Sequence, residues 1–409
     1  MYENLVNQSA SKDLKSDIKN HRLPGAVLFS GPEASGKLTA ALETARILSC
    51  HEEGSHRFDC SCNSCMQHKS LTCTNLLLLG PRDCFLEISS SKKTFLDAVA
   101  VNAPYLTAAR YLFLRSIRKL TLRFSEILWQ GDKDLSKIGT IMQDINENLE
   151  KLDFPRQLPP FEELEKICSS LEKKSLDLES DYLYDSIPVN QIRNMEVWAH
   201  IKSEEGKKTI IIENADRMQS SVRNALLKIL EEPPESCIFI LLTSKKNAIM
   251  QTILSRVRNY AFKERSTEEQ YDVIKRVFHR ENFSGTINEY LLTFLPVNPQ
   301  VIKSQADDFF EALASHKIPQ LSEIIKKCGN FNPRVELKIF LETIALKGRP
   351  LAKSPEGSET AFEMTGLLQK TWDNITLFNQ TPLAALEILT RDIAALNVKN
   401  GNILKCALM

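Results

Sequence analysis

The sequence contains no apolar run that approaches the roughly 18 residues needed to cross a bilayer. Its first residues, Met1-Tyr2-Glu3-Asn4, are not basic and lead into no apolar core, so we expect no secretory signal. The chain also lacks a charge excess, because 52 Lys and Arg balance 52 Asp and Glu. The bulk charge therefore points neither to nucleic acid nor to an anionic membrane as a direct partner. We expect a cytoplasmic protein with no membrane partner.

Length and cysteine content set two further bounds. A chain of 409 residues is expected to divide into two or three domains rather than share one core. In a reducing compartment, ten cysteines favour free thiols or metal ligands over a disulfide framework.

The stretch from Lys208 to Phe262 carries the most distinctive pattern. Thr209–Ile212 is a short β-branched run, typical of a buried parallel strand. Glu213 follows at the carboxyl end of this strand, where open α/β sheets place their ligands. The pattern then predicts, in order, a helix over Ser220–Leu230 stopped by Pro233-Pro234, a strand over Ile238–Leu242, the pair Ser255-Arg256, and a strand near Tyr260–Phe262.

A phosphate-loop pattern lies upstream. The apolar run Ala26–Phe29 precedes the sequence Gly31-Pro32-Glu33-Ala34-Ser35-Gly36-Lys37-Leu38-Thr39, after which a helix is predicted to about Cys50. Such a loop directs backbone N–H groups and a helix N-terminus at phosphate oxygens, and the lysine adds charge. The match to GxxxxGK is complete, but the Ser or Thr expected next is Leu38.

Together these motifs identify a family. Two motifs closely resemble those of the small subunits of DNA-polymerase clamp loaders, which are AAA+ proteins. They are Asn224-Ala225-Leu226-Leu227-Lys228-Ile229-Leu230-Glu231-Glu232-Pro233-Pro234 and Ser255-Arg256. The resemblance implies an α/β AAA+ module, a parallel sheet flanked by helices, with a zinc module, a helical lid and a C-terminal helical collar. We expect the core at 1–95 and 181–264, a helical insertion at 96–180, the lid at 265–314 and the collar at 315–409. Leu5–Gln8 either packs near an adenine, as in the relatives, or covers the sheet.

Four cysteines form a candidate metal site. Short turns separate Cys50, Cys60, Cys62 and Cys65, and four thiolates suit a closed, structural zinc ion. This resembles the zinc module of bacterial clamp-loader subunits, although Cys60 is displaced by one residue from that pattern. His51, His56 and His68 are therefore possible substitutes, and ordinary reduced cysteines are the alternative to a metal site.

The insertion has a helical pattern. Apolar residues recur every three or four positions over 113–127 and again over 138–152, which predicts a helical hairpin outside the core, followed by a charged helix over 161–180. Arg115, Lys119 and Arg123 fall on one stripe of the first arm. This stripe is either a surface for phosphates or a partner, or an ordinary solvated face.

The residues at the sheet edge indicate which kind of subunit this is. An NTPase needs a hydroxyl after the loop lysine, an acid at the strand end to hold magnesium, and a carboxylate to orient water. This chain has Leu38, Glu213 and Asn214 at those positions, with Thr39 turned about 100° away on the helix. Glu33 also brings negative charge into the loop. We therefore expect no hydrolysis and regard ATP binding as doubtful.

Ser255-Arg256, by contrast, is intact. In relatives this arginine reaches into a neighbour's nucleotide site, and a local ion pair with Glu264 or Glu268 is the alternative. The combination resembles the delta-prime type of subunit in bacterial DNA polymerase III. The resemblance implies delta and gamma/tau subunits as partners, and the sliding clamp and primed DNA through the complex. An ATP-hydrolysing gamma/tau-type subunit is the main alternative. A P-loop kinase is a second alternative, which the Glu-Glu-Pro-Pro motif disfavours because a kinase has no need of it.

Overall fold

The computed structural model describes residues 1–52, 56–202, 206–376, 378 and 380–407. The chain divides into two compact units, Met1–Leu291 and Leu292–Met409. None of the helices in the described part of the chain is both long and apolar enough to span a membrane.

A five-stranded parallel sheet forms the centre of the first unit. Its strand order is β2-β3-β4-β1-β5, and every neighbouring pair is parallel. The strands are β1 (Ala26–Ser30), β2 (Leu76–Leu79), β3 (Lys208–Ile212), β4 (Cys237–Thr243) and β5 (Arg258–Ala261). This arrangement confirms the predicted α/β fold with a parallel sheet flanked by helices.

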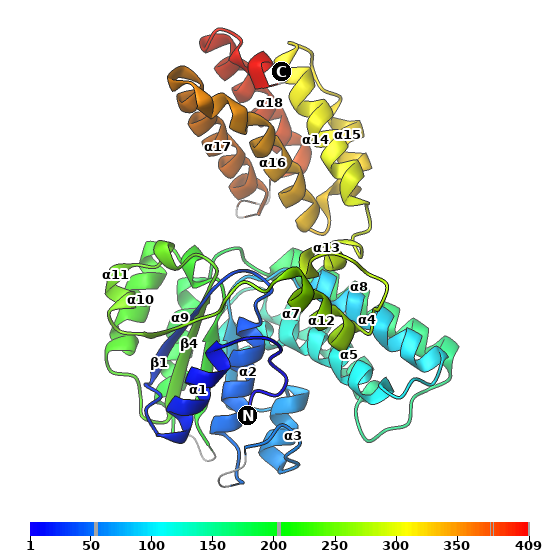
Figure 1. Cartoon of the computed structure of the whole chain (residues 1–409), viewed down its shortest axis with the longest axis vertical. Coiled ribbons are helices and arrows are strands. Elements are labelled where there is room, and N and C mark those ends of the chain that lie inside the picture. Colours follow the sequence, from blue (N-terminus) through cyan, green and yellow to red (C-terminus); the bar gives the residue numbers. More distant parts are fainter. Residues whose placement is uncertain (53–55, 203–205, 377, 379, 408–409) are drawn as a thin grey trace. The chain divides into compact units, whose positions relative to one another are not determined.

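Every residue of β1 to β4 is buried, and since successive side chains along a strand point to opposite sides, both faces of this part of the sheet are covered. On one face Val27 and Ile211 pack with residues of α1 (Ala10–Lys19) and α2 (Lys37–Leu48). On the other, Leu28 and Ile210 pack with residues of helices that include α9 (Val189–His200) and α10 (Ser220–Glu231). Figure 1 shows the sheet between α2 and these two helices.

The remaining elements of the first unit are mostly helical. They are α3 (Asn63–Ser70), α4 (Phe85–Ala100), α5 (Leu106–Thr121), η1 (Leu122–Phe124), α6 (Glu126–Trp129), α7 (Leu135–Leu152), α8 (Phe161–Tyr182), η2 (Ala215–Arg217), η3 (Lys246–Ala248), α11 (Gln251–Leu254), α12 (Thr267–Phe278) and α13 (Ile287–Leu292).

The insertion is helical, as predicted, but it does not lie outside the core. Phe113 and Ile117 of α5 belong to the same buried cluster as Leu77, Leu79 and Ile210 of the sheet. The prediction that the insertion lies outside the core is therefore corrected. The apolar residues of α5 share one buried cluster with residues of α4 and the sheet, so they do not pack only within a hairpin.

The second unit is a set of packed helices, α14 (Pro299–Ala314), α15 (Leu321–Lys327), η4 (Gly329–Phe331), α16 (Val335–Gly348), η5 (Arg349–Lys353), α17 (Pro355–Thr376), α18 (Pro382–Lys399) and η6 (Ile403–Ala407). The observed division falls before the last residue of α13, so the segment proposed as a lid, 265–314, has α12 and most of α13 in the first unit and α14 in the second. The helical composition agrees with the expected collar, whose function as a collar stays a prediction.

Candidate functional site: a degenerate phosphate loop and a thiol cluster

The phosphate loop joins β1 to α2 and is held by its own chain. Lys37 Nζ donates to the carbonyl oxygen of Gly31 at 2.6 Å. Arg265 reaches the same loop, because its Nη1 donates to Ala34 O at 2.6 Å and its Nη2 to Val6 O at 2.8 Å. A Cβ atom on Gly36, which has a φ of 90°, would meet Leu5 at 2.8 Å. The N-terminal segment thus packs directly against the loop.

The surroundings of Lys37 lower the pKa of its ammonium group. Burial lowers the pKa of Lys37 to about 8, and the nearby Glu213 and Glu33 oppose that shift only in part. Leu38, the next residue, is 6% exposed and belongs to the apolar cluster beneath the loop, while Thr39 is half-buried. The helix therefore presents an isobutyl group to the core where a metal-binding hydroxyl would be needed.

Glu213 lies at the end of β3 and is already bound on both oxygens. Arg82 Nη1 donates to Oε1 at 2.8 Å, and Arg123 Nη2 donates to Oε2. Asn214, in the left-handed region with a φ of 49°, donates its side-chain amide to Pro81 O at 2.7 Å. The predicted edge residues are thus brought together, but two arginines and a proline carbonyl hold them.

The cationic stripe of the insertion is part of this edge. Arg123 is 2% exposed, and Lys119 bonds to Glu87 rather than to solvent. Arg115 Nη1 bonds to the carbonyls of His68 and Lys69. Both interpretations offered by the sequence, a phosphate or partner surface and a solvated face, are therefore wrong for these three side chains.

Arg256 lies near the other end of the sheet. Its Nε donates to Glu231 Oε1 at 3.0 Å and its Nη1 to Thr252 O at 2.6 Å. Two residues later β5 begins, with Arg258 paired to Val27 near the start of β1, whereas the phosphate loop follows the end of β1. The local partner is thus Glu231, not the Glu264 or Glu268 considered from the sequence, and Arg256 is separated from the loop by the length of β1.

The four predicted cysteines form one cluster. The Sγ atoms of Cys50, Cys60, Cys62 and Cys65 all lie within 4.8 Å of one another, a donor set that could hold one metal ion. All four are free thiols. Burial alone would raise the pKa of Cys62, but hydrogen bonds from the backbone of Cys65 and His51 lower it to about 6. Four converging sulfurs fit a closed tetrahedral zinc site.

A buried arginine supports this cluster and was not recognised from the sequence. Arg46 of α2 is 2% exposed and donates from Nη1 to Cys65 Sγ at 3.0 Å. It also donates to the carbonyl of His56 at 2.9 Å and pairs with Glu43. Its position in the phosphate-loop helix, 19 residues before Cys65, gave no signal of this contact. Of the possible histidine substitutes, His68 contacts Cys73 through Nδ1 at 3.5 Å.

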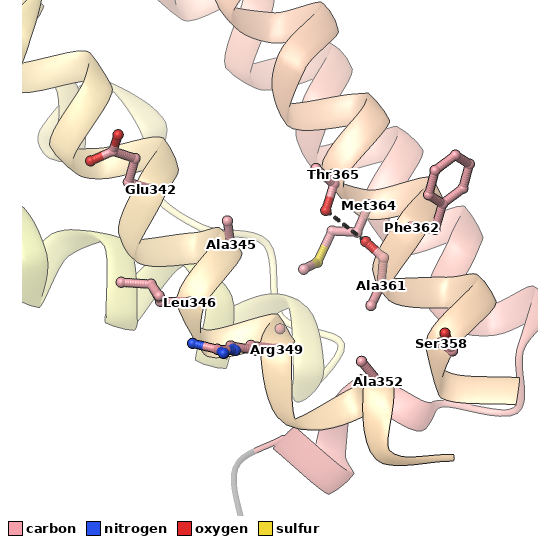
Figure 2. Close-up of a pocket in the computed structure, with 11 residues that line it drawn as sticks. Glu342, Ala345, Leu346, Arg349, Ala352, Ser358, Ala361, Phe362, Met364 and Thr365 are labelled. Carbon is pink, nitrogen blue, oxygen red and sulfur yellow. Dashed lines mark hydrogen bonds between the residues drawn. The ribbon is translucent and has the colours of Figure 1, made fainter. Parts of the chain in front are cut away.

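The second unit has a shallow hollow between α16, η5 and α17 (Figure 2). Its lining is mostly apolar, and Met364 reaches from α17 toward α16, where a Cβ on Gly348 would meet its terminal methyl at 1.9 Å. Glu342 and Arg349 are its charged lining residues. This lining offers neither a thiol cluster nor paired carboxylates.

Comparison with known proteins identifies the family. The family model described as "DNA polymerase III, delta subunit" matches residues 6–127 and 142–266, which is more than half of the chain. The chain belongs to this family. The DNA polymerase III subunit delta' of Haemophilus influenzae is 29% identical over 113 residues, 27% of this chain and 33% of that protein. The DNA polymerase III subunit tau of Bacillus subtilis is 48% identical over 56 residues, 14% of this chain and 10% of that protein.

These matches span a third or less of the relatives' length. A solved DNA polymerase III gamma subunit-related protein from Thermotoga maritima is 14% identical, with a TM-score of 0.26 over 56% of this chain and 89% of that chain. The clamp-loader subunit type predicted from the sequence motifs is confirmed by the family match and the delta' relative.

Proposed function

We propose that this family member is a delta-prime-type clamp-loader subunit that does not hydrolyse ATP. It assembles with delta and gamma/tau subunits into the complex that loads the sliding clamp onto primed DNA, and it supplies Arg256 to a neighbour's nucleotide site. The observation that carries the proposal is the state of Glu213: both oxygens of the acid that would hold magnesium are bound by arginines of the same chain.

The rest of the loop supports the absence of turnover. Magnesium-assisted hydrolysis needs a metal ligand after the loop lysine and a carboxylate that orients water. Leu38 is buried in the apolar core, and the amide of Asn214 is bound to Pro81 O. Lys37 and Arg265 bind loop carbonyls, so even nucleotide binding would require these bonds to be exchanged.

A structural zinc ion is the second part of the proposal. Zinc would be held by Cys50, Cys60, Cys62 and Cys65 and would fix the loop between α2 and α3, a role that needs no open coordination position. When bound, it supplies four strong bonds that close this loop.

An ATP-hydrolysing gamma/tau-type subunit is the alternative, and the 48% identity to the tau subunit of Bacillus subtilis over a short stretch favours it. The two are separated by measuring ATP turnover of the isolated full chain with magnesium, with Lys37→Ala as the matched control. We expect no turnover above that of the Lys37→Ala variant. Turnover that disappears in the Lys37→Ala variant would establish the motor subunit instead.

Partner choice has its own test. A tagged full chain, expressed with delta and gamma/tau subunits from the same source, is expected to co-purify in one complex of fixed stoichiometry. Elution of the tagged chain apart from both subunits would contradict the assembly role.

A further inference from the structure

The sheet edge holds a continuous ion network, and part of it comes from the insertion. Glu213 binds Arg82 and Arg123, Arg82 also binds Glu87 through Nη2 at 2.7 Å, and Glu87 binds Lys119. Three cations therefore surround two carboxylates. Arg123 and Lys119 both belong to the α5–η1 segment, about 90 residues from Glu213 in the chain.

The position of Arg123 is fixed on all sides. Its Nε donates to Gly80 O at 3.0 Å, at the end of β2, and its own carbonyl accepts a bond from Trp129 Nε1 at 2.9 Å. The Arg123 side chain is 1% exposed, and that of Glu213 is 9% exposed. A pair so desolvated differs from a surface ion pair, because removing one partner leaves a buried charge uncompensated.

The neighbouring carboxylate shows the strength of this cationic environment. Burial alone would raise the pKa of Glu87, but Lys119 and Arg82 lower it to about 2. Fixed side chains of the same chain thus hold Glu87 in its ionised form. In a nucleotide-hydrolysing site the same task, neutralising an acid at the end of this strand, is performed by a divalent cation.

We propose that Arg123 is a built-in counter-ion: the insertion places its guanidinium on Glu213 where a magnesium ion would otherwise bind, so the edge is complete without metal. This inference deepens the proposed non-hydrolysing function and assigns the insertion a role in it. It makes the chain indifferent to magnesium, and it makes a divalent cation the ligand expected to occupy the edge once Arg123 is removed.

The test is rescue by a divalent cation. Thermal unfolding of the full, zinc-loaded chain is measured with and without 5 mM magnesium at constant ionic strength, for the wild type and for Arg123→Ala. Arg123→Ala leaves Oε2 of Glu213 without its cation. We expect magnesium to raise the Tm of this variant by about 2–4 °C, as for a ligand at roughly ten times its Kd. The wild type should not respond.

Arg118→Ala is the matched control, because Arg118 is a buried arginine of the adjoining helix α5 that pairs with Asp153, not with Glu213. Magnesium should not change its Tm, and the Arg123→Ala/Glu213→Gln double variant should lose the response. If Arg123→Ala does not fold, Arg123→Gln is used, since it removes the charge from Glu213 but keeps a donor for Gly80 O.

Two results would overturn the inference. One is a folded Arg123→Ala, or Arg123→Gln in its place, with no magnesium response that depends on Glu213. The other is a Glu213-dependent response in the wild type. Neither measurement involves ATP turnover or partner subunits, so the inference and the proposed function can fail separately.

Discussion

Glu336 shows how a single buried acid can set the pH dependence of the second unit. It is fully buried in α16, and burial raises its pKa to about 7 despite smaller opposing effects of the backbone at Val297 and Asn332. A raised carboxyl pKa means that the folded state favours the protonated form. Stability is therefore highest below pH 4.5 for this group and is lost as the pH rises from about 4.5 to 7.

Glu336→Gln should remove this loss. The amide stays neutral, so we expect the variant to be more stable than the wild type by up to about 3 kcal/mol at pH 8 and nearly unchanged at pH 4.5. Urea unfolding at both pH values measures the difference, and Glu342→Gln, on the exposed side of the same helix, is the control. An equal effect of both substitutions would contradict the role of burial.

Cys60 decides the ligand set of the thiol cluster. We expect one zinc per chain in protein purified without chelator, and a loss of stoichiometric zinc in Cys60→Ser because the closed site needs four ligands. Metal analysis by mass spectrometry gives the ratio, and Cys406→Ser is the control because Cys406 is an exposed cysteine outside the cluster. Full zinc in Cys60→Ser would indicate that a nearby histidine completes the site.

At the scale of elements, the insertion is part of the first unit's core, and its removal tests this. Replacing residues 101–183 by a short flexible linker exposes Leu77 and Leu79 and leaves Glu213 without Arg123. Losses of this kind cost several kcal/mol each, so we expect the first unit not to fold cooperatively. Near-ultraviolet circular dichroism and limited proteolysis report on this, with the truncation to 1–291 as a control that keeps the insertion. A deletion variant with native-like protection of the sheet would restore the view of the insertion as a separate excursion.

The sequence predicted the strands and failed on the contacts between them and the insertion. Runs such as Thr209–Ile212 and Ile238–Leu242 are short and apolar, so their identity as buried strands is a local property. The helix α4 was missed, because Ser89, Ser90 and Ser91 interrupt its pattern and all three are buried. Ser91 uses its hydroxyl toward Ser116 of α5 at 2.8 Å, a tertiary contact that compensates for weak local preference.

The candidate site was predictable to a similar degree. The positions of Lys37, Leu38 and Glu213 followed from motif spacing alone, as did the four cysteines. The partners of these residues did not, because Arg123 and Glu213 are 90 residues apart and Arg256 and Glu231 are 25 apart. The sequence pattern of a charged stripe is the same whether the stripe faces solvent or a buried acid, and only the three-dimensional packing distinguishes the two.

At the scale of the whole molecule, the proposal depends on Arg256 acting on another chain. Its guanidinium binds Glu231 and Thr252 O in the isolated chain, with the Glu231 side chain 50% exposed, so this ion pair contributes little and can be exchanged for a phosphate. An arginine that bridges two oxygens of a terminal phosphate stabilises the charge that develops during transfer, and such residues contribute on the order of 10³-fold to the rate.

We expect Arg256→Ala to leave folding and subunit assembly intact but to lower ATP turnover of the reconstituted loader by up to that factor. Arg256→Lys should not restore it, because an ammonium group lacks the planar fork. Arg258→Ala is the matched control, since Arg258 lies two residues away and pairs with Asp17 of its own chain. Wild-type turnover with Arg256→Ala, or an equal loss with Arg258→Ala, would show that this edge of the subunit does not act on its neighbour's nucleotide.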